Sequence, residues 1–337
     1  MLNKFLMSAF ALSLAASVAF GAQGVKFYVG DGDTEKAFNT MVNEKIAPIG
    51  FVLSDPHEHI DHAYKTKWGT EFQTIKGVTS KHPDFDPSFK ENLDNLGFFS
   101  VMNDAIVGPL LVKEPSLGGF SPFNLHIYKA KGEDKTYVGH VMPKTMLDIV
   151  GVKDKEVRKT FTASFDALDK MTSNDIGNKV KYVDYKSLPK KPMMTFEVPF
   201  DRAGGVEKFK SDFQGKFEEA FEAHKYIIAG YKDVKGSMTD LKVASFDRFD
   251  AYWVYSLCHF RFSEGIFNNG RPDAGVFAPC SMYMYVDKGS NKMIVGMPRL
   301  ETWKSVMGIK DQKMVDSIMG LDKEIVTIMK ELGAKEL

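Results

Sequence analysis

An internal repeat is the feature that most constrains how this chain can fold. When the sequence is aligned with itself at an offset of 157 residues, positions 108–154 match positions 265–311 without a gap. Fifteen of the 47 aligned positions are identical, and many of these are glycine or proline, which restrict backbone geometry. A unit of this length is far longer than a solenoid repeat. The sequence therefore predicts two copies of one domain.

Both copies show the same order of expected elements, because apolar residues recur with helical or strand spacing at corresponding places. In the first copy the pattern predicts strands at 25–29, 51–53, 97–102, 123–129 and 136–141, with helices at 34–47 and 157–171. In the second copy it predicts strands at 194–198, 226–229, 252–258, 280–286 and 293–297, with helices at 206–223 and 314–328. This order predicts an α+β fold of two homologous domains, each a mostly antiparallel sheet with two long helices packed on one face.

The domain boundaries follow from the repeat and from local composition. We expect a first domain at 22–171 and a second at 193–337. The segment between them, 172–192, is polar and rich in lysine and contains Pro189 and Pro192, so we expect a linker there.

The N-terminus has the pattern of a secretory signal peptide over residues 1–21. Lys4 precedes an apolar stretch at 5–20, and Ala19 and Gly21 have the small-residue spacing of a cleavage site. The stretch is shorter than the roughly 20 residues of a spanning helix. An uncleaved anchor is the alternative, but no later segment is apolar enough to span a bilayer. We expect export to the periplasm or secretion, and no membrane span after cleavage.

The charge balance bears on the class of partner. The chain has 44 Lys and Arg against 44 Asp and Glu, a formal net charge of zero. A general nucleic-acid binder normally has a basic surplus that pairs with phosphates. We therefore expect no nucleic-acid partner.

Two groups of segments resemble a known family. Cys258-His259-Phe260, followed by Gly275-Val276-Phe277-Ala278-Pro279-Cys280, is similar to the Cys-Asn-Pro and Leu-Pro-Cys segments of the domain of unknown function 302 family, with His259 and Phe260 in place of Asn and Pro. Gly50-Phe51-Val52-Leu53 and Lys67-Trp68-Gly69 are similar to that family's Gly-Phe and Lys-x-Gly segments. The resemblance suggests an exported tandem member of the family. It implies an α+β domain with β-α-β-sheet-α order and no established activity.

A histidine-rich segment is the first candidate for chemistry. His57, His59, Asp61 and His62 fit the His-x-His-x-Asp-His signature of metallo-β-lactamase-like hydrolases, in which a metal-bound water is the nucleophile. That fold places several strands before the motif, whereas few mature residues precede His57 here. On an extended strand His57, His59 and Asp61 would share one face. A divalent metal site of another kind and a solvated edge strand are the alternatives.

The two cysteines, Cys258 and Cys280, are the second candidate. In the first copy Val101 and Phe123 occupy the equivalent positions, so we expect both thiols to point into a core. Buried cysteines in an oxidising compartment would form a structural disulfide. Free buried thiols are an alternative, and so is a redox-active pair, although no Cys-x-x-Cys spacing supports one.

Cys280, Met282 and Met284 alternate along one expected strand, and soft sulfur ligands suit copper(I). The first copy has Phe, Leu and Ile at these positions, which favours a core role.

These observations favour an exported two-domain protein that binds a small ligand, a metal or a protein partner without catalysing a reaction. The groove between the domains, or that between sheet and helices, is the expected ligand site. The rival hypotheses are a metal-dependent hydrolase that uses the histidine segment and a thiol/disulfide oxidoreductase that uses the cysteines.

Overall fold

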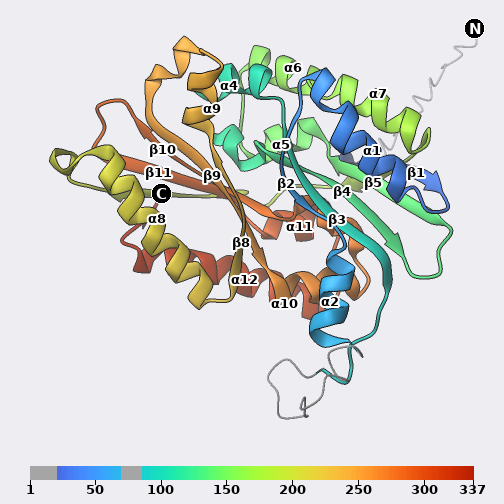
Figure 1. Cartoon of the computed structure of the whole chain (residues 1–337). Helices are drawn as coiled ribbons and strands as arrows, with labels where there is room; N and C mark the ends of the chain where they lie inside the picture. The colour runs from blue at the N-terminus through green and yellow to red at the C-terminus, as the bar shows by residue number, and fades with distance from the viewer. Residues whose placement is uncertain (1–20, 70–85) are drawn as a thin grey trace, which may run out of the picture.

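The computed structural model describes residues 21–69 and 86–337 (Figure 1). The leader predicted over residues 1–21 lies, apart from Gly21, outside the described residues. No helix of the described part is both long and apolar enough to cross a membrane.

Two six-stranded sheets form the two halves of the molecule. The strands of the first are β1 (Ala22–Asp31), β2 (Val52–His57), β3 (Leu93–Met102), β4 (Phe123–Ala130), β5 (Lys135–Val141) and β6 (Lys179–Tyr185). Those of the second are β7 (Met193–Pro199), β8 (Tyr226–Asp233), β9 (Phe249–His259), β10 (Cys280–Asp287), β11 (Lys292–Pro298) and β12 (Lys335–Glu336). All neighbouring strands are antiparallel.

The strand orders of the two sheets are the same. The first is β2-β3-β4-β5-β1-β6, and the second, read from its other edge, is β8-β9-β10-β11-β7-β12. Even the irregularities correspond, because the register shifts between Leu53 and Asp55 in β2 and between Ile228 and Gly230 in β8. The prediction of two homologous α+β domains is confirmed.

Helices cover one face of each sheet (Figure 1). In the first domain these are α1 (Glu35–Thr40), which continues as a π-helical turn at Met41–Lys45, and the pair α6 (Lys155–Ala163) and α7 (Asp166–Asp175). In the second they are α8 (Val206–Ala223) and α12 (Gln312–Glu331). The buried residues of α8, Phe213, Phe217 and Phe221, are four residues apart, so they form one apolar stripe against the sheet.

The other α-helices of the described residues lie at strand ends. They are α2 (Ile60–Trp68), α4 (Asp104–Lys113), α5 (Pro143–Ile149), α9 (Val234–Asp240), α10 (Phe260–Ser263) and α11 (Glu301–Val306).

The linker is shorter than the sequence predicts. Of the expected segment 172–192, the first part completes α7, and β6 pairs with β1 in the first sheet. Only 186–192 connects the domains. The prediction was wrong here because β6 is an edge strand whose first four residues are exposed, and a polar, lysine-rich edge strand has the composition of a linker.

Each domain packs one of its 3₁₀ segments against the sheet of the other domain. Pro115–Phe120 of the first domain packs on β10, and Pro272–Phe277 of the second packs on β4. The hydroxyl of Tyr252 donates to the Pro115 carbonyl at 2.6 Å, and His126 Nε2 lies 2.8 Å from the Pro272 carbonyl. Pro115 and Pro272 are equivalent in the repeat, so each domain packs its equivalent segment on the other domain, although the contacting residues Tyr252 and His126 are not equivalent.

A buried ion pair also crosses this junction. Lys232 Nζ of β8 lies 2.8 Å from Asp104 Oδ2 of α4, and both side chains are 9% exposed. Separating the two side chains would leave each charge buried without its partner, which is energetically unfavourable. The pair therefore stabilises this relative position of the two domains.

Candidate functional site

The histidine segment does not form the extended strand that the sequence suggests. Strand β2 ends at His57, His59 has left-handed backbone angles (φ 51°, ψ 43°), and α2 begins at Ile60. The chain therefore turns within the motif, and its side chains do not share one strand face.

The four candidate metal ligands do not converge on one point. His57 Nε2 lies 2.8 Å from the Ala229 carbonyl of the second domain, so this ring joins the domains. His59 Nε2 lies 3.1 Å from Glu35 Oε1, and its ring stacks on that of His62 at 4.9 Å. The predicted metal site at His57, His59, Asp61 and His62 is thus not assembled.

Asp61 has a structural role in this segment. Its Oδ1 accepts a hydrogen bond from the Leu96 amide at 3.0 Å, which ties α2 to β3. Burial raises the pKa of Asp61, against the opposing effect of His62, whose Nε2 lies 3.6 Å from Asp61 Oδ2. Across residues 21–69 and 86–337, no group of three or more His, Cys, Asp or Glu side chains is arranged to hold a metal ion.

Cys258 and Cys280 are free thiols in the structure. The strands that carry them are neighbours, and Cys280 pairs with Leu257, one position before Cys258. Both cysteines nevertheless line one small cavity, and Cys258 is among the causes that raise the pKa of Cys280, so the two thiols lie near each other without a bond between them. The disulfide predicted from the sequence is not formed in the structure, and the thiol count given in the Discussion tests whether it forms in the exported protein.

The environment of the thiols also bears on redox chemistry. Burial raises the pKa of Cys258 to about 11 and raises that of Cys280 further. A thiol that stays protonated is a poor nucleophile. Met282 and Met284, on the same face as Cys280, are fully buried, as core residues are.

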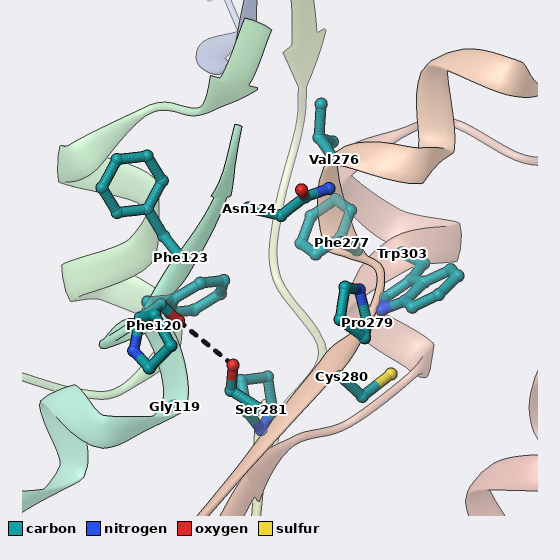
Figure 2. A pocket seen from close by; sticks show the side chains of 12 residues that line it. Gly119, Phe120, Phe123, Asn124, Val276, Phe277, Pro279, Cys280, Ser281 and Trp303 are labelled. Atoms are coloured by element: carbon teal, nitrogen blue, oxygen red, sulfur yellow. Dashed lines mark hydrogen bonds between the residues drawn. The ribbon is translucent and has the colours of Figure 1, made fainter. Parts of the chain in front are cut away.

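Two small cavities adjoin Cys280. One lies where the 3₁₀ segments of the two domains meet and is lined by residues that the repeat relates, such as Phe120 with Phe277 and Pro122 with Pro279 (Figure 2). The hydroxyl of Ser281 donates to the Pro122 carbonyl across this junction at 3.1 Å (Figure 2). Each cavity has a volume of about 20 Å³, space for one or two water molecules but not for an organic ligand.

A larger cleft lies between the domains, and we call it the Tyr137 cleft. Its volume is about 360 Å³, within the range of roughly 300–1,000 Å³ typical of small-molecule sites. The first domain contributes Asn92, Tyr128, Glu133, Tyr137 and Lys181, and the second contributes residues 267–268 and 270–273, among them Arg271 and Asp273.

The sheet presents an aromatic wall to this cleft. The rings of Tyr128 and Tyr137, paired across β4 and β5, stack at 4.7 Å, and the Lys181 ammonium lies 5.0 Å from the centre of the Tyr137 ring. Burial is the main reason that the pKa of both tyrosines is raised. Both hydroxyls therefore stay protonated and can donate hydrogen bonds.

The opposite wall is held by a bidentate ion pair. Arg271 donates from Nε and Nη2 to the carboxylate of Asp273 at 2.9 and 3.0 Å, and Nη2 also donates to the Met307 carbonyl. This arrangement fixes the guanidinium and leaves Nη1 available at the cleft.

Sequence reasoning predicted a groove between the domains but none of these residues. Lys181 fell in the expected linker at 172–192. At 179–183 lysines alternate with apolar residues, a pattern that favours a strand. This pattern does not predict which residues of the other domain the Lys181 side chain lies near.

The comparisons with known proteins add little. No known protein-family profile matches the sequence, and no curated protein matches it. The structure is similar to "Crystal structure of uncharacterized conserved protein DUF302 from Bacillus stearothermophilus", with 14% identity and a TM-score of 0.34 over 41% of this chain and 96% of that chain. A likeness at this TM-score carries no argument about this chain. Membership of that family therefore stays a prediction.

Proposed function

We propose that this protein is exported and binds a small ligand in the Tyr137 cleft without transforming it. The observation that carries the proposal is a cleft of about 360 Å³ walled by both domains, in which aromatic rings stand beside polar groups that the protein itself does not use. Binding sites of small molecules commonly lie at such domain junctions.

The properties of the wall support binding rather than catalysis. Its tyrosines are held protonated, and its guanidinium is paired with Asp273, so these groups are hydrogen-bond donors and not bases. The ring nitrogens of His57 and His126 are engaged at the domain junction, and both thiols are buried away from the cleft.

Export rests on the leader pattern at 1–21. Strand β1 begins at Ala22, the residue that cleavage after Gly21 would leave at the N-terminus. Residues needed by the fold would then be retained in the mature chain.

Ligand-observed NMR tests the proposal. The wild-type protein is screened against a fragment library of neutral sugars, organic acids, amines and nucleosides. We expect at least one class to bind. We expect Tyr137→Ala to weaken that binding about tenfold or more, because it removes both the ring and its hydroxyl.

Tyr182→Ala is the matched control. Tyr182 is a 43% exposed tyrosine on β6, and it points to the face opposite its neighbour Lys181. The proposal fails when no fragment binds, or when Tyr137→Ala and Tyr182→Ala have the same effect.

A further inference from the structure

Resting on this proposed function, we infer that the ligand is an uncharged, hydroxyl-rich ring compound, that is, a neutral monosaccharide. The inference comes from the hydrogen-bonding groups that the Tyr137 cleft offers and from their charges.

The unused groups comprise donors, acceptors and hydroxyls that can act as both. Arg271 Nη1 and Lys181 Nζ are donors, and the carboxylate of Glu133 is an acceptor. The hydroxyls of Tyr128 and Tyr137 donate or accept. None of these groups has a hydrogen-bond partner among the described residues.

Asn92 adds a second acceptor. Its backbone and side-chain N–H groups donate to Asn268 at 3.1 and 2.8 Å, which fixes the amide and leaves its side-chain oxygen as an acceptor. Six groups thus offer two donors, two acceptors and two hydroxyls. Sugar hydroxyls, each of which donates and accepts, match such a mixed set.

The charges of the cleft favour a neutral ligand. Lys181 and Arg271 are balanced by Glu133 and Asp273, and Arg271 is already neutralised by Asp273. A carboxylate ligand would be attracted by Lys181 but repelled by Glu133. An ammonium ligand would be attracted by Glu133 but repelled by Lys181. Neither gains a net charge partner to offset the loss of its hydration.

The tyrosine rings supply the apolar part of the site. Tyr137 is partly exposed, and Lys181, the side chain over its ring, is on the exposed edge strand. The ring carbons of a sugar have an apolar face that can pack on such a surface while the hydroxyls reach the surrounding groups.

The experiment compares neutral, anionic and cationic forms of the same sugar ring, for two different sugars. Methyl glucoside and methyl galactoside are neutral, the corresponding uronates are anionic, and the corresponding 2-amino sugars are cationic. Each is titrated into wild-type protein and into Tyr137→Ala by saturation-transfer NMR. We expect a neutral glycoside to bind and both charged forms of it to bind roughly tenfold more weakly.

Glu133→Gln provides a second readout, because it removes one charge without changing shape. We expect it to shift the ratio of the two affinities several-fold toward the uronate, because the charge that repels the uronate is gone, whereas the neutral glycoside loses part of its hydrogen bonding to the Glu133 carboxylate. Glu331→Gln, at an exposed position on α12, is the matched control and should change neither.

The outcomes separate the two proposals. When fragments of another class bind in a Tyr137-dependent way and no sugar does, the proposed function stands and the saccharide inference falls. A charged sugar that binds more tightly than its neutral counterpart also overturns the inference. When nothing in the library binds, both fall.

Discussion

Replacing Gly275 by alanine should destabilise the protein through the junction of its two domains. Gly275 lies in the 3₁₀ segment that the second domain packs on the first sheet, and a Cβ there would come within 2.5 Å of His126 Cε1 and 2.6 Å of Nε2. Real side chains do not tolerate such distances, so either the segment or the ring must move.

The ring of His126 cannot move without further loss. It is fully buried, and its two nitrogens lie 2.8 Å from the carbonyls of Gly97 and Pro272. Overpacking costs about 1–3 kcal/mol, and loss of the one hydrogen bond that the neutral imidazole donates adds about 1 kcal/mol. We therefore expect Gly275→Ala to lower the free energy of unfolding by about 2–4 kcal/mol.

Urea denaturation followed by circular dichroism measures this change. Gly265→Ala is the matched control, because an added Cβ at Gly265 meets nothing within 4 Å. The control should stay within about 0.5 kcal/mol of wild type. Equal stabilities for the two variants would refute the packing of this 3₁₀ segment on His126.

Three further predictions follow from buried charges and thiols. Lys232→Ala leaves Asp104 buried without its partner, and we expect urea denaturation to show a free energy of unfolding lower by about 3–5 kcal/mol. Adding Asp104→Asn should restore most of this free energy, and an unchanged stability of Lys232→Ala would contradict the buried pair. For Asp169, burial acts to raise the pKa, but hydrogen bonds from His140 and Lys26 outweigh it and lower the pKa to about 2. A carboxyl whose pKa is lower in the folded state stabilises the protein above its unfolded pKa. Up to about 2 kcal/mol should therefore be lost as the pH falls from 4 to 2, and Asp169→Asn should remove this dependence in acid titrations of stability. Thiol titration of exported, denatured protein without reductant should find two thiols per chain at Cys258 and Cys280, whereas none would establish the disulfide.

Much of the fold could be predicted from local patterns. The phenylalanine spacing of α8 predicted its observed bounds, Val206–Ala223, because residues four apart necessarily share a helix face. The repeat then transferred each assignment between copies, and the equal strand orders confirm this.

The candidate site was predicted less well. The alternation of His57, His59 and Asp61 suggested one strand face, yet the left-handed backbone of His59 ends that strand and starts α2. Such a turn has no signature in the residue types present. Both thiols were expected to point into a core, and both line a small cavity, but the one-residue offset between them in the pairing of β9 with β10 was not visible in the sequence.

The sequence alone determined the number of domains, the order of their elements and the residues that form their cores, because glycine, proline and apolar spacing act over a few neighbouring residues. Only the tertiary structure decided which groups the polar side chains contact. His126 and Pro272 are 146 positions apart, and Lys181 reaches the Tyr137 ring only because β6 joins the first sheet. These contacts depend on how two packed domains close on each other, and no local pattern records that closure.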